Sequence, residues 1–429
     1  MSVARPALPV AARSLGLRRS LPACGAPLPA CGALLSACGV LLSACGVLLS
    51  ACGVLLSACG VLLSACGAHP PATAPGKQAN LGLEVVNVLA PAPVPEASSA
   101  VLAAPAFSAP VITPTPTPPA GLTPLTAGQR AALLTGAEDT LAGTPIHYVK
   151  SNEVRHDVWF PYIRGVGGAY LGVGSDQNYT VAAAARSELM FLSDIDRSVV
   201  DLHRIYEVLI EASDTPEALH ARFDRVHEDT SATLLDAGLA ALPEAERRRL
   251  VRLYRNARET VHRHLRHVIN RKRDGEPTTW LSDPVMYDHI RALFQADRVR
   301  QMGGDLTGSN SLQTAAAAAR ALGIPLRVIY FSNAEEYFDY SRSFIANIQA
   351  FETDERSVLL RTIYNKDWVH ADLLWAYQVQ PLADFKRRLG ERKNRSRNPM
   401  FRYAEFDGTL NRETGTRGLS LISLPVAAG

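Results

Sequence analysis

The sequence predicts an α/β fold with a doubly wound, mostly parallel sheet, and three observations support that class. Apolar runs at residues 169–173, 188–193, 326–331 and 357–364 have the length and side chains of buried strands. Alanine-rich or amphipathic segments that favour helices lie between these runs, and such alternation pairs the strands in parallel with right-handed crossovers. The first two runs are joined by a glycine turn and a helical segment, which is a βαβ pattern.

The glycine turn is the stretch around which the rest of the chain is organised. Gly172 and Gly174 lie where the first strand ends, and Asp176, Gln177 and Asn178 lead into a helical segment at 179–186. The next strand ends on the carboxylates Asp194 and Asp196. Strand, glycine turn, helix and strand with a terminal acid form half of a nucleotide-binding Rossmann sheet.

The chemistry of this unit points to a ligand that contains a ribose. A turn without side chains lets the backbone approach a ligand, the helix N-terminus offers free N–H groups, and an acid can bind both ribose hydroxyls. Gln177 stands where a dinucleotide-binding turn has its third glycine, which disfavours a nicotinamide-dependent oxidoreductase and suits S-adenosylmethionine. The other interpretation is that the glycines serve only tight packing.

The amino-terminal part of the chain has a different composition. All seven cysteines lie in residues 1–67, spaced by seven in a Gly-Val-Leu-Leu-Ser-Ala-Cys repeat, and residues 68–125 are rich in Pro, Ala and Thr. The repeat either is a low-complexity tract or acts as a secretion signal, since Leu-Ser-Ala-Cys resembles the lipobox of bacterial lipoproteins. We therefore expect a membrane-anchored, extracytoplasmic lipoprotein, or a cytoplasmic protein if the signal is not used.

The predicted folded part, residues 126–429, is electrically neutral. Residues 1–125 carry five basic and two acidic side chains, which account for the net charge of +3 of the 429-residue chain. A neutral domain gives no argument for nucleic acid as a partner, so a small-molecule ligand is expected. The basic side chains near 385–402 predict a flexible or solvated segment.

A helical insertion is expected at about 198–300. Its longest helix, from about residue 244 to 269, carries many arginines, and an interpretation as a solvated face paired with acids is favoured over a phosphate or lipid site. His262 and His264 point apart on this helix, so no metal site is predicted. Upstream of the glycine turn, polar residues 152–157 either fold over the ligand or form a solvated loop with an internal ion pair.

Several segments together resemble a known family. YVKSNE, GGAYLGVGSDQNYT, SDID, GGDLTG and IYFSNAEEYF are similar to an uncharacterised bacterial family with a core like that of class I S-adenosylmethionine-dependent methyltransferases. The resemblance covers about residues 147–364. It implies that Gly172 and Gly174 form the cofactor turn and that Asp194 or Asp196 is the ribose acid.

The same resemblance suggests where catalysis would take place. It implies that Asn333, after the strand at 326–331, occupies the position of a catalytic or substrate-binding polar residue, and we expect Glu335 and Tyr337 of the same loop to act with it. The first functional hypothesis is thus a methyltransferase-like enzyme that binds S-adenosylmethionine, of unknown methyl acceptor. The alternative is a tethered lipoprotein whose Rossmann-like domain binds another nucleotide-like ligand or a partner protein without catalysis.

Overall fold

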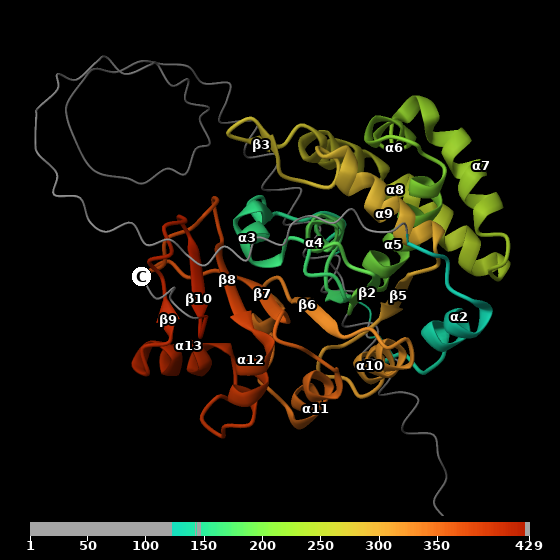
Figure 1. The fold of residues 1–429 in the computed structure, drawn as a ribbon. Helices are drawn as coiled ribbons and strands as arrows, with labels where there is room; N and C mark the ends of the chain where they lie inside the picture. The colour runs from blue at the N-terminus through green and yellow to red at the C-terminus, as the bar shows by residue number, and fades with distance from the viewer. Residues whose placement is uncertain (1–121, 142, 144–146, 425–429) are drawn as a thin grey trace, which may run out of the picture. The chain divides into compact units, whose positions relative to one another are not determined.

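A mostly parallel sheet of eight strands forms the centre of the protein (Figure 1). The computed structural model describes residues 122–141, 143 and 147–424, so the cysteine repeat and nearly all of the Pro-rich stretch lie outside the described residues. The strand order is β5 (Val299–Gly303), β2 (Leu189–Asp194), β1 (Ala169–Gly172), β6 (Leu326–Tyr330), β7 (Val358–Ile363), β8 (Ala376–Pro381), β10 (Leu419–Ile422) and β9 (Leu410–Asn411).

The first five of these strands are parallel, and the remaining three are mixed. The order β5-β2-β1-β6-β7 is the doubly wound arrangement, in which the chain moves outward from β1 in one direction and then returns to begin again at β6. Strand β8 runs antiparallel to β7, β10 is parallel to β8, and β9 is antiparallel to β10. The predicted fold class is therefore confirmed.

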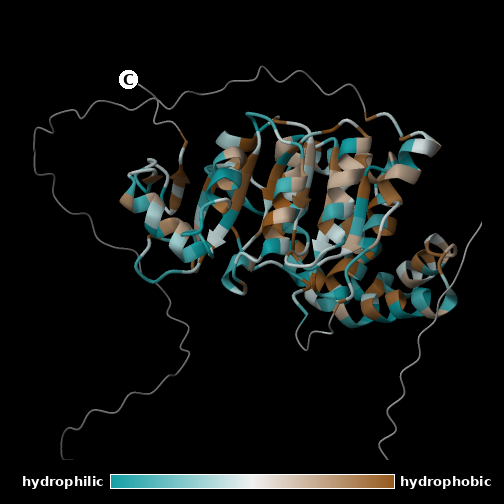
Figure 2. Cartoon of the chain, turned by 90° about the horizontal axis from the view of Figure 1, so that it is seen from below, coloured by the Kyte–Doolittle hydropathy of each residue, from teal (hydrophilic) through white to brown (hydrophobic). Residues whose placement is uncertain are grey.

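Helices cover both faces of the sheet because each strand is apolar on both sides. Tyr170 and Met190 pack into one core, whereas their neighbours Leu171 and Phe191 pack into a second core on the opposite face. The first core includes residues of η1 (His156–Trp159), α3 (Phe160–Ile163), α4 (Gln177–Ala185), α5 (Arg197–Glu211) and α9 (Pro284–Gln295). The second includes residues of α2 (Ala127–Leu134), α10 (Ser311–Ala321), α11 (Arg342–Ala350) and α12 (Leu382–Leu389). The strands are mostly brown in Figure 2, and the helices mix brown and teal.

The connection from β2 to β5 is a long helical segment. It contains α5, α6 (Pro216–Arg222), η2 (Arg225–His227), α7 (Glu228–Gly238), α8 (Glu244–Ile269), the hairpin of β3 (Lys272–Arg273) and β4 (Glu276–Pro277), and α9. Arginines of α8 pair with acids: Arg249 lies 2.8 Å from Asp201, and Arg258 lies 3.1 Å from Glu228. The pairing with acids that the sequence predicted is confirmed, but Arg258 is buried and not part of a solvated face.

Two element boundaries differ from the sequence prediction. The sequence pattern of residues 284–299 predicts a single helix, but helix α9 ends at Gln295 and strand β5 follows. Its Arg300 is buried and donates to the carbonyl oxygens of Leu133 (2.6 Å) and Thr135 (2.9 Å), a compensation that only the folded chain provides. The sequence pattern of residues 338–351 predicts a helix as well, but helix α11 begins only at Arg342.

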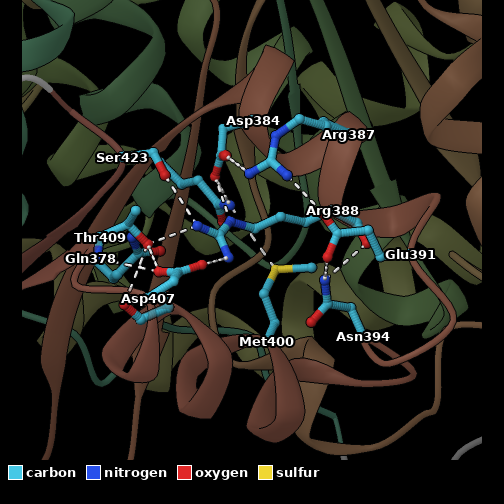
Figure 3. A network of polar contacts seen from close by, with 12 residues as sticks. Gln378, Asp384, Arg387, Arg388, Glu391, Asn394, Met400, Asp407, Thr409 and Ser423 are labelled. Atoms are coloured by element: carbon cyan, nitrogen blue, oxygen red, sulfur yellow. Dashed lines mark hydrogen bonds and ion pairs between the residues drawn. The ribbon is translucent and has the colours of Figure 1, made fainter.

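The prediction that residues 385–402 are flexible or solvated is right only in part, because Arg387, Arg392, Lys393 and Arg395 are exposed but the segment is largely helical. Helices α12 and α13 (Arg397–Phe406) belong to the folded domain, and the Arg388 side chain is only 1% exposed. Its guanidinium lies 2.8 Å from Asp384 and 3.1 Å from Asp407, and it also donates to Thr409 at 2.6 Å (Figure 3). Two carboxylates and a hydroxyl offset the loss of hydration, so a basic residue is stable in this interior position.

Candidate functional site

The predicted ligand site lies at the carboxyl ends of β1, β2 and β6. The strand order reverses between β1 and β6, and ligands of such sheets bind in the crevice outside the carboxyl ends at this point. The backbone N–H of Gly174, in the turn after β1, donates to Oδ2 of Asp194, at the end of β2, over 2.9 Å. The glycine turn and the acidic strand end therefore lie together, as the sequence predicted.

Asn178 holds the glycine turn from within. Its side-chain amide donates to the carbonyl oxygens of Val173 (3.0 Å), Gly174 (3.0 Å) and Ser175 (2.8 Å), and its Oδ1 accepts from the Tyr170 hydroxyl at 2.7 Å. Asn178 is fully buried. Its amide therefore stabilises the shape of the turn and is not presented to a ligand.

Gly172 and Gly174 are required as glycines for different structural reasons. A Cβ at Gly172 would collide with Oδ1 of Asn178 and with the Tyr170 hydroxyl, so close packing is by itself enough to require this glycine. The cofactor-binding role expected for Gly172 stays a prediction. Gly174 has φ of +87°, a left-handed conformation that favours glycine, and a Cβ there would collide with the Gln177 amide.

Asp176 and Gln177 are also used inside the protein. Asp176 Oδ1 lies 2.7 Å from Nε2 of His264, near the end of α8, and Oδ2 accepts from Trp280 Nε1 at 3.4 Å. Burial alone would raise the pKa of Asp176, but His264, Trp280 and Arg271 together outweigh it and lower that pKa. Gln177 Oε1 accepts from Ser175 Oγ at 3.0 Å. The helical insertion thus packs against the turn.

The two acids after β2 have separate roles. Asp196 is buried, caps α5 by accepting from Ser198 N at 2.8 Å, and contacts His147 Nδ1 at 2.9 Å. Asp194 is half-buried, and burial raises its pKa to about 6 although the N–H groups of Asp196 and Gly174 act in the opposite direction. Beside it the Ile195 side chain is 47% exposed.

A buried histidine that the sequence analysis missed completes the turn. His203 of α5 donates from Nε2 to the Gly174 carbonyl at 2.8 Å, so its Nδ1 accepts from the Tyr179 hydroxyl at 2.7 Å. Burial lowers the pKa of His203 to about 4, which keeps the ring neutral at pH 7. The sequence signal for the burial of His203 was its spacing of four from Val199 and three from Tyr206, both of which are buried on α5.

Glu153 forms a second polar centre, at the ends of β6 and β7. This buried carboxyl group accepts from the hydroxyls of Tyr330 (2.6 Å), Ser332 (2.5 Å) and Thr362 (2.9 Å), and it lies 3.2 Å from His156 Nε2. Ser332 has φ of +51°, a left-handed conformation that is rare for serine.

The internal ion pair expected within residues 152–157 is confirmed, whereas the folding of these residues over a ligand stays a prediction. Arg155 and Asp157 form the internal ion pair, at 2.9 Å. Glu153 and His156 are instead buried, with Glu153 bound to the strand ends that border the crevice. The charge of Glu153 did not reveal its burial, because all of its hydroxyl partners come from strands far along the chain.

The predicted catalytic residues do not converge on one point. Asn333 Nδ2 donates to Glu336 at 3.3 Å and to the Tyr337 hydroxyl at 3.4 Å, and Tyr337 is 77% exposed. Glu335 is buried, accepts from the Tyr340 hydroxyl and forms an ion pair of 3.2 Å with buried Arg361. Asn333 and Tyr337 thus lie together on the surface, while Glu335 is directed into the protein.

The second glycine stretch, 302–308, binds a carboxylate of the chain itself. Asp139 accepts from the N–H groups of Ser309 (3.1 Å) and Asn310 (2.9 Å) at the start of α10, and a Cβ at Gly308 would collide with it. The side chain therefore occupies the position where this helix N-terminus could bind an anion.

Two open hollows lie on the described surface. One, of about 320 Å³, is lined by residues 335–339 and 396–398, and we call it the β6 hollow because residues 335–339 follow β6. The other, of about 490 Å³, lies between α2 and α10. Within the described part of the chain no group of three His, Cys, Asp or Glu residues could hold a metal ion. None of the helices described there is long and apolar enough to span a bilayer.

Comparison with known proteins identifies a family. A family described as "Domain of unknown function (DUF7790)" matches residues 148–423. The chain belongs to this family. No curated protein matches the sequence. Among solved structures, the rRNA methyltransferase AviRa from Streptomyces viridochromogenes aligns over 57% of this chain and 84% of its own, with 11% identity and a TM-score of 0.24. Values this low transfer no activity to the DUF7790 chain, so its function is argued from the site.

Proposed function

We propose that the DUF7790 domain binds a ribose-bearing small molecule, with S-adenosylmethionine as the first candidate, at the carboxyl ends of β1, β2 and β6. The observation that carries the proposal is the 2.9 Å contact of Gly174 N with Asp194 at the point where the strand order reverses. The contact holds a turn with no side chain at Gly174 beside a carboxylate that is still partly exposed.

The residues around this contact fit the parts of the proposed ligand. Asp194 would accept hydrogen bonds from the ribose hydroxyls, and the exposed Ile195 next to it offers an apolar surface for the base. Asp176, Asp194 and Asp196 surround the turn with carboxyl groups, which favour a sulfonium cation over the pyrophosphate of a dinucleotide. S-adenosylmethionine, when bound, supplies an electrophilic methyl group.

The reaction inferred from this ligand is methyl transfer. Such transfer requires that the acceptor be held in line with the donor group, so the protein contributes mainly position. Support comes from the loop after β6, because it begins at the same crevice and presents Asn333 and the exposed ring of Tyr337.

The test is calorimetric titration of the full chain with S-adenosylmethionine, S-adenosylhomocysteine and NAD. We expect the first two to bind, and Asp194→Ala to weaken that binding by about ten-fold or more, since hydrogen bonds to a charged group contribute about 1.5–3 kcal/mol. Asp229→Asn on α7 is the control, because Asp229 is 90% exposed and only contacts Arg255. Binding of NAD alone would indicate an oxidoreductase.

A tethered domain without catalysis is the second candidate. One observation favours it: Asp176, Gln177, Asn178 and Asp196 already bond to other groups of the chain, so the turn is complete without a ligand. Mass spectrometry of the mature amino terminus tests the tether, with a diacylglyceryl group expected on one cysteine of the Leu-Ser-Ala-Cys repeat. An unmodified terminus would remove the reason for an extracytoplasmic location.

A further inference from the structure

Residues 147–153, which we call the strap, connect groups at the carboxyl ends of strands that are not neighbours in the sheet. At the start of the strap, Nδ1 of His147 contacts Asp196, which follows β2, at 2.9 Å. At its end, the Glu153 carboxyl group accepts from Ser332 after β6 and from Thr362 of β7. Strand β1 lies between β2 and β6, so the strap passes the carboxyl end of β1, where the strand order reverses.

The length of the strap agrees with a direct path. Adjacent strands are about 4.8 Å apart, so the ends of β2 and β6 are separated by about 10 Å. The residues from His147 to Glu153 can span about 20 Å when extended. Val149 packs against the first core, which holds the strap close to the sheet.

The two ends of the strap are held unequally. Glu153 is buried and accepts from the hydroxyl groups of Tyr330, Ser332 and Thr362. Within the described residues, the His147 side chain contacts only Asp196, and it is 47% exposed. Withdrawing a buried carboxyl group from several donors costs much free energy, whereas a half-exposed pair contributes little to stability. The strap therefore opens more easily at His147 than at Glu153.

Between its ends the strap is joined to the sheet by few contacts. Among the described residues, no backbone N–H or carbonyl group of residues 148–152 takes part in a hydrogen bond. Tyr148 and Lys150 are exposed, and the Asn152 side chain accepts from Trp375 Nε1 at 3.2 Å, beside the Glu153 end. Segments with exposed backbone groups and few buried contacts open locally at a low cost in free energy. The strap can therefore move while the sheet stays folded.

We infer that the strap is a lid over the proposed ligand site, released at His147 and hinged near Glu153. The contact between His147 and Asp196 is the latch of this lid. Asp196 N donates to Oδ1 of Asp194 at 2.8 Å, so the latch lies next to the proposed ribose acid. A ligand that approaches Asp194 from the carboxyl edge of the sheet passes the strap. The identity of the ligand rests on the proposed function, whereas the opening of the strap can be measured without a ligand.

The first experiment measures opening by limited trypsin digestion of the full chain without ligand, followed by mass spectrometry. Lys150 lies within the strap, and cleavage after it requires that the strap leave the sheet. His147→Ala removes the latch but leaves the cap of α5, because Asp196 still accepts from Ser198. We expect cleavage after Lys150 to become about five-fold faster, with an unchanged thermal midpoint.

Two references accompany this digestion. Cleavage after exposed Arg225 of η2 in the same sample should keep its rate. His227→Ala, which replaces an exposed histidine of the same element, should leave cleavage after Lys150 unchanged. An unchanged rate after Lys150 in His147→Ala, or an equal increase after Arg225, would overturn the assignment of the latch.

The second experiment measures the rates of S-adenosylmethionine binding by surface plasmon resonance on the immobilised full chain. A latch that holds the lid in both the free and the bound protein slows entry and exit alike. In His147→Ala we therefore expect the association and dissociation rate constants both to rise about five-fold, with little change in Kd. Loss of a direct ligand contact would raise the dissociation rate constant alone.

The outcomes separate the lid from the proposed function. Unchanged rate constants in His147→Ala, or a rise in dissociation alone, would overturn the lid. Absence of S-adenosylmethionine binding by the unmodified chain would instead count against the proposed function. In that case the trypsin digestion still decides whether His147 latches the strap.

Discussion

The turn after β1 and the loop after β6 leave the same edge of the sheet, but their polar groups are arranged in opposite ways. In the turn, the side chains of Asn178, Asp176 and Gln177 and both backbone groups of Gly174 bond to other parts of the chain. In the loop, Glu153 fixes only its first residue, Ser332, whereas Tyr337 and Asp339 are exposed. The comparison teaches that the motif residues mainly maintain the shape of the turn, whereas the loop after β6 carries exposed polar side chains.

The strongest test of this contrast removes the central side chain of the turn. Asn178→Ala leaves the Tyr170 hydroxyl and three carbonyl oxygens without their partner in a buried place, so we expect a loss of about 3–5 kcal/mol in the free energy of unfolding, measured by urea denaturation. A loss below about 1 kcal/mol would mean that the turn holds its shape without this residue.

The pH dependence of stability is the next test. The pKa of His203 is lowered to about 4 in the folded protein from an ordinary value near 6.5, so its contribution to stability is complete above pH 6.5 and is lost as pH falls through 4. Asp194 acts in the opposite sense, because its raised pKa of about 6 adds stability at low pH that is lost as pH rises through 6. In His203→Gln we expect the fall in unfolding free energy from pH 6.5 to 4 to shrink by roughly 3 kcal/mol.

The control for this experiment is His289→Gln. Burial lowers the pKa of His289 to about 4 as well, but this residue bonds to the Ser187 carbonyl and does not contact the turn. Both variants should reduce the fall in unfolding free energy between pH 6.5 and 4. Only His203→Gln should also weaken S-adenosylmethionine binding. Equal S-adenosylmethionine binding by both variants would show that the turn is not part of the ligand site.

A smaller effect is expected where the loop after β6 is fixed. Glu153→Gln keeps the size of the side chain but replaces one acceptor oxygen by an amide donor that faces hydroxyl groups, so we expect a loss of about 2 kcal/mol in unfolding free energy. Thr362→Val, which removes one donor, should have a smaller effect. If Glu153→Gln were as stable as the unmodified chain, this carboxyl group would not fix the loop.

The smallest effect belongs to the open part of the loop. Tyr337→Ala should change the unfolding free energy by at most about 0.5 kcal/mol, since its ring is 77% exposed and its hydroxyl makes only a 3.4 Å contact with Asn333. Thermal unfolding of Tyr337→Ala and of Asn178→Ala, measured side by side, tests the contrast between the loop and the turn directly. A large loss would show that the loop, like the turn, is part of the framework.

The sequence predicted the positions of β1, α4 and β2 well because their patterns are local. Alternation of apolar strands with alanine-rich helices, and glycines between them, depends only on nearest neighbours along the chain. Strand β5 was missed because its Arg300 and Gln301 hide its apolar character, and their partners lie in distant segments. The packing contact of Gly172 could not be foreseen for a similar reason, since its neighbour in space, the Asn178 amide, can be placed only once the helix has formed.

By itself, the sequence determined the fold class and the meeting of the Gly174 turn with Asp194, because a right-handed βαβ crossover places its two parallel strands side by side. Only the tertiary structure decided which polar side chains are bonded within the fold and which remain exposed. Glu153, His203 and Arg388 are buried by partners from distant parts of the chain, whereas Asp339 and Tyr337 are not. The physical reason is that the stability of a buried polar group depends on partners brought together in space, and residue type and local spacing do not specify these partners.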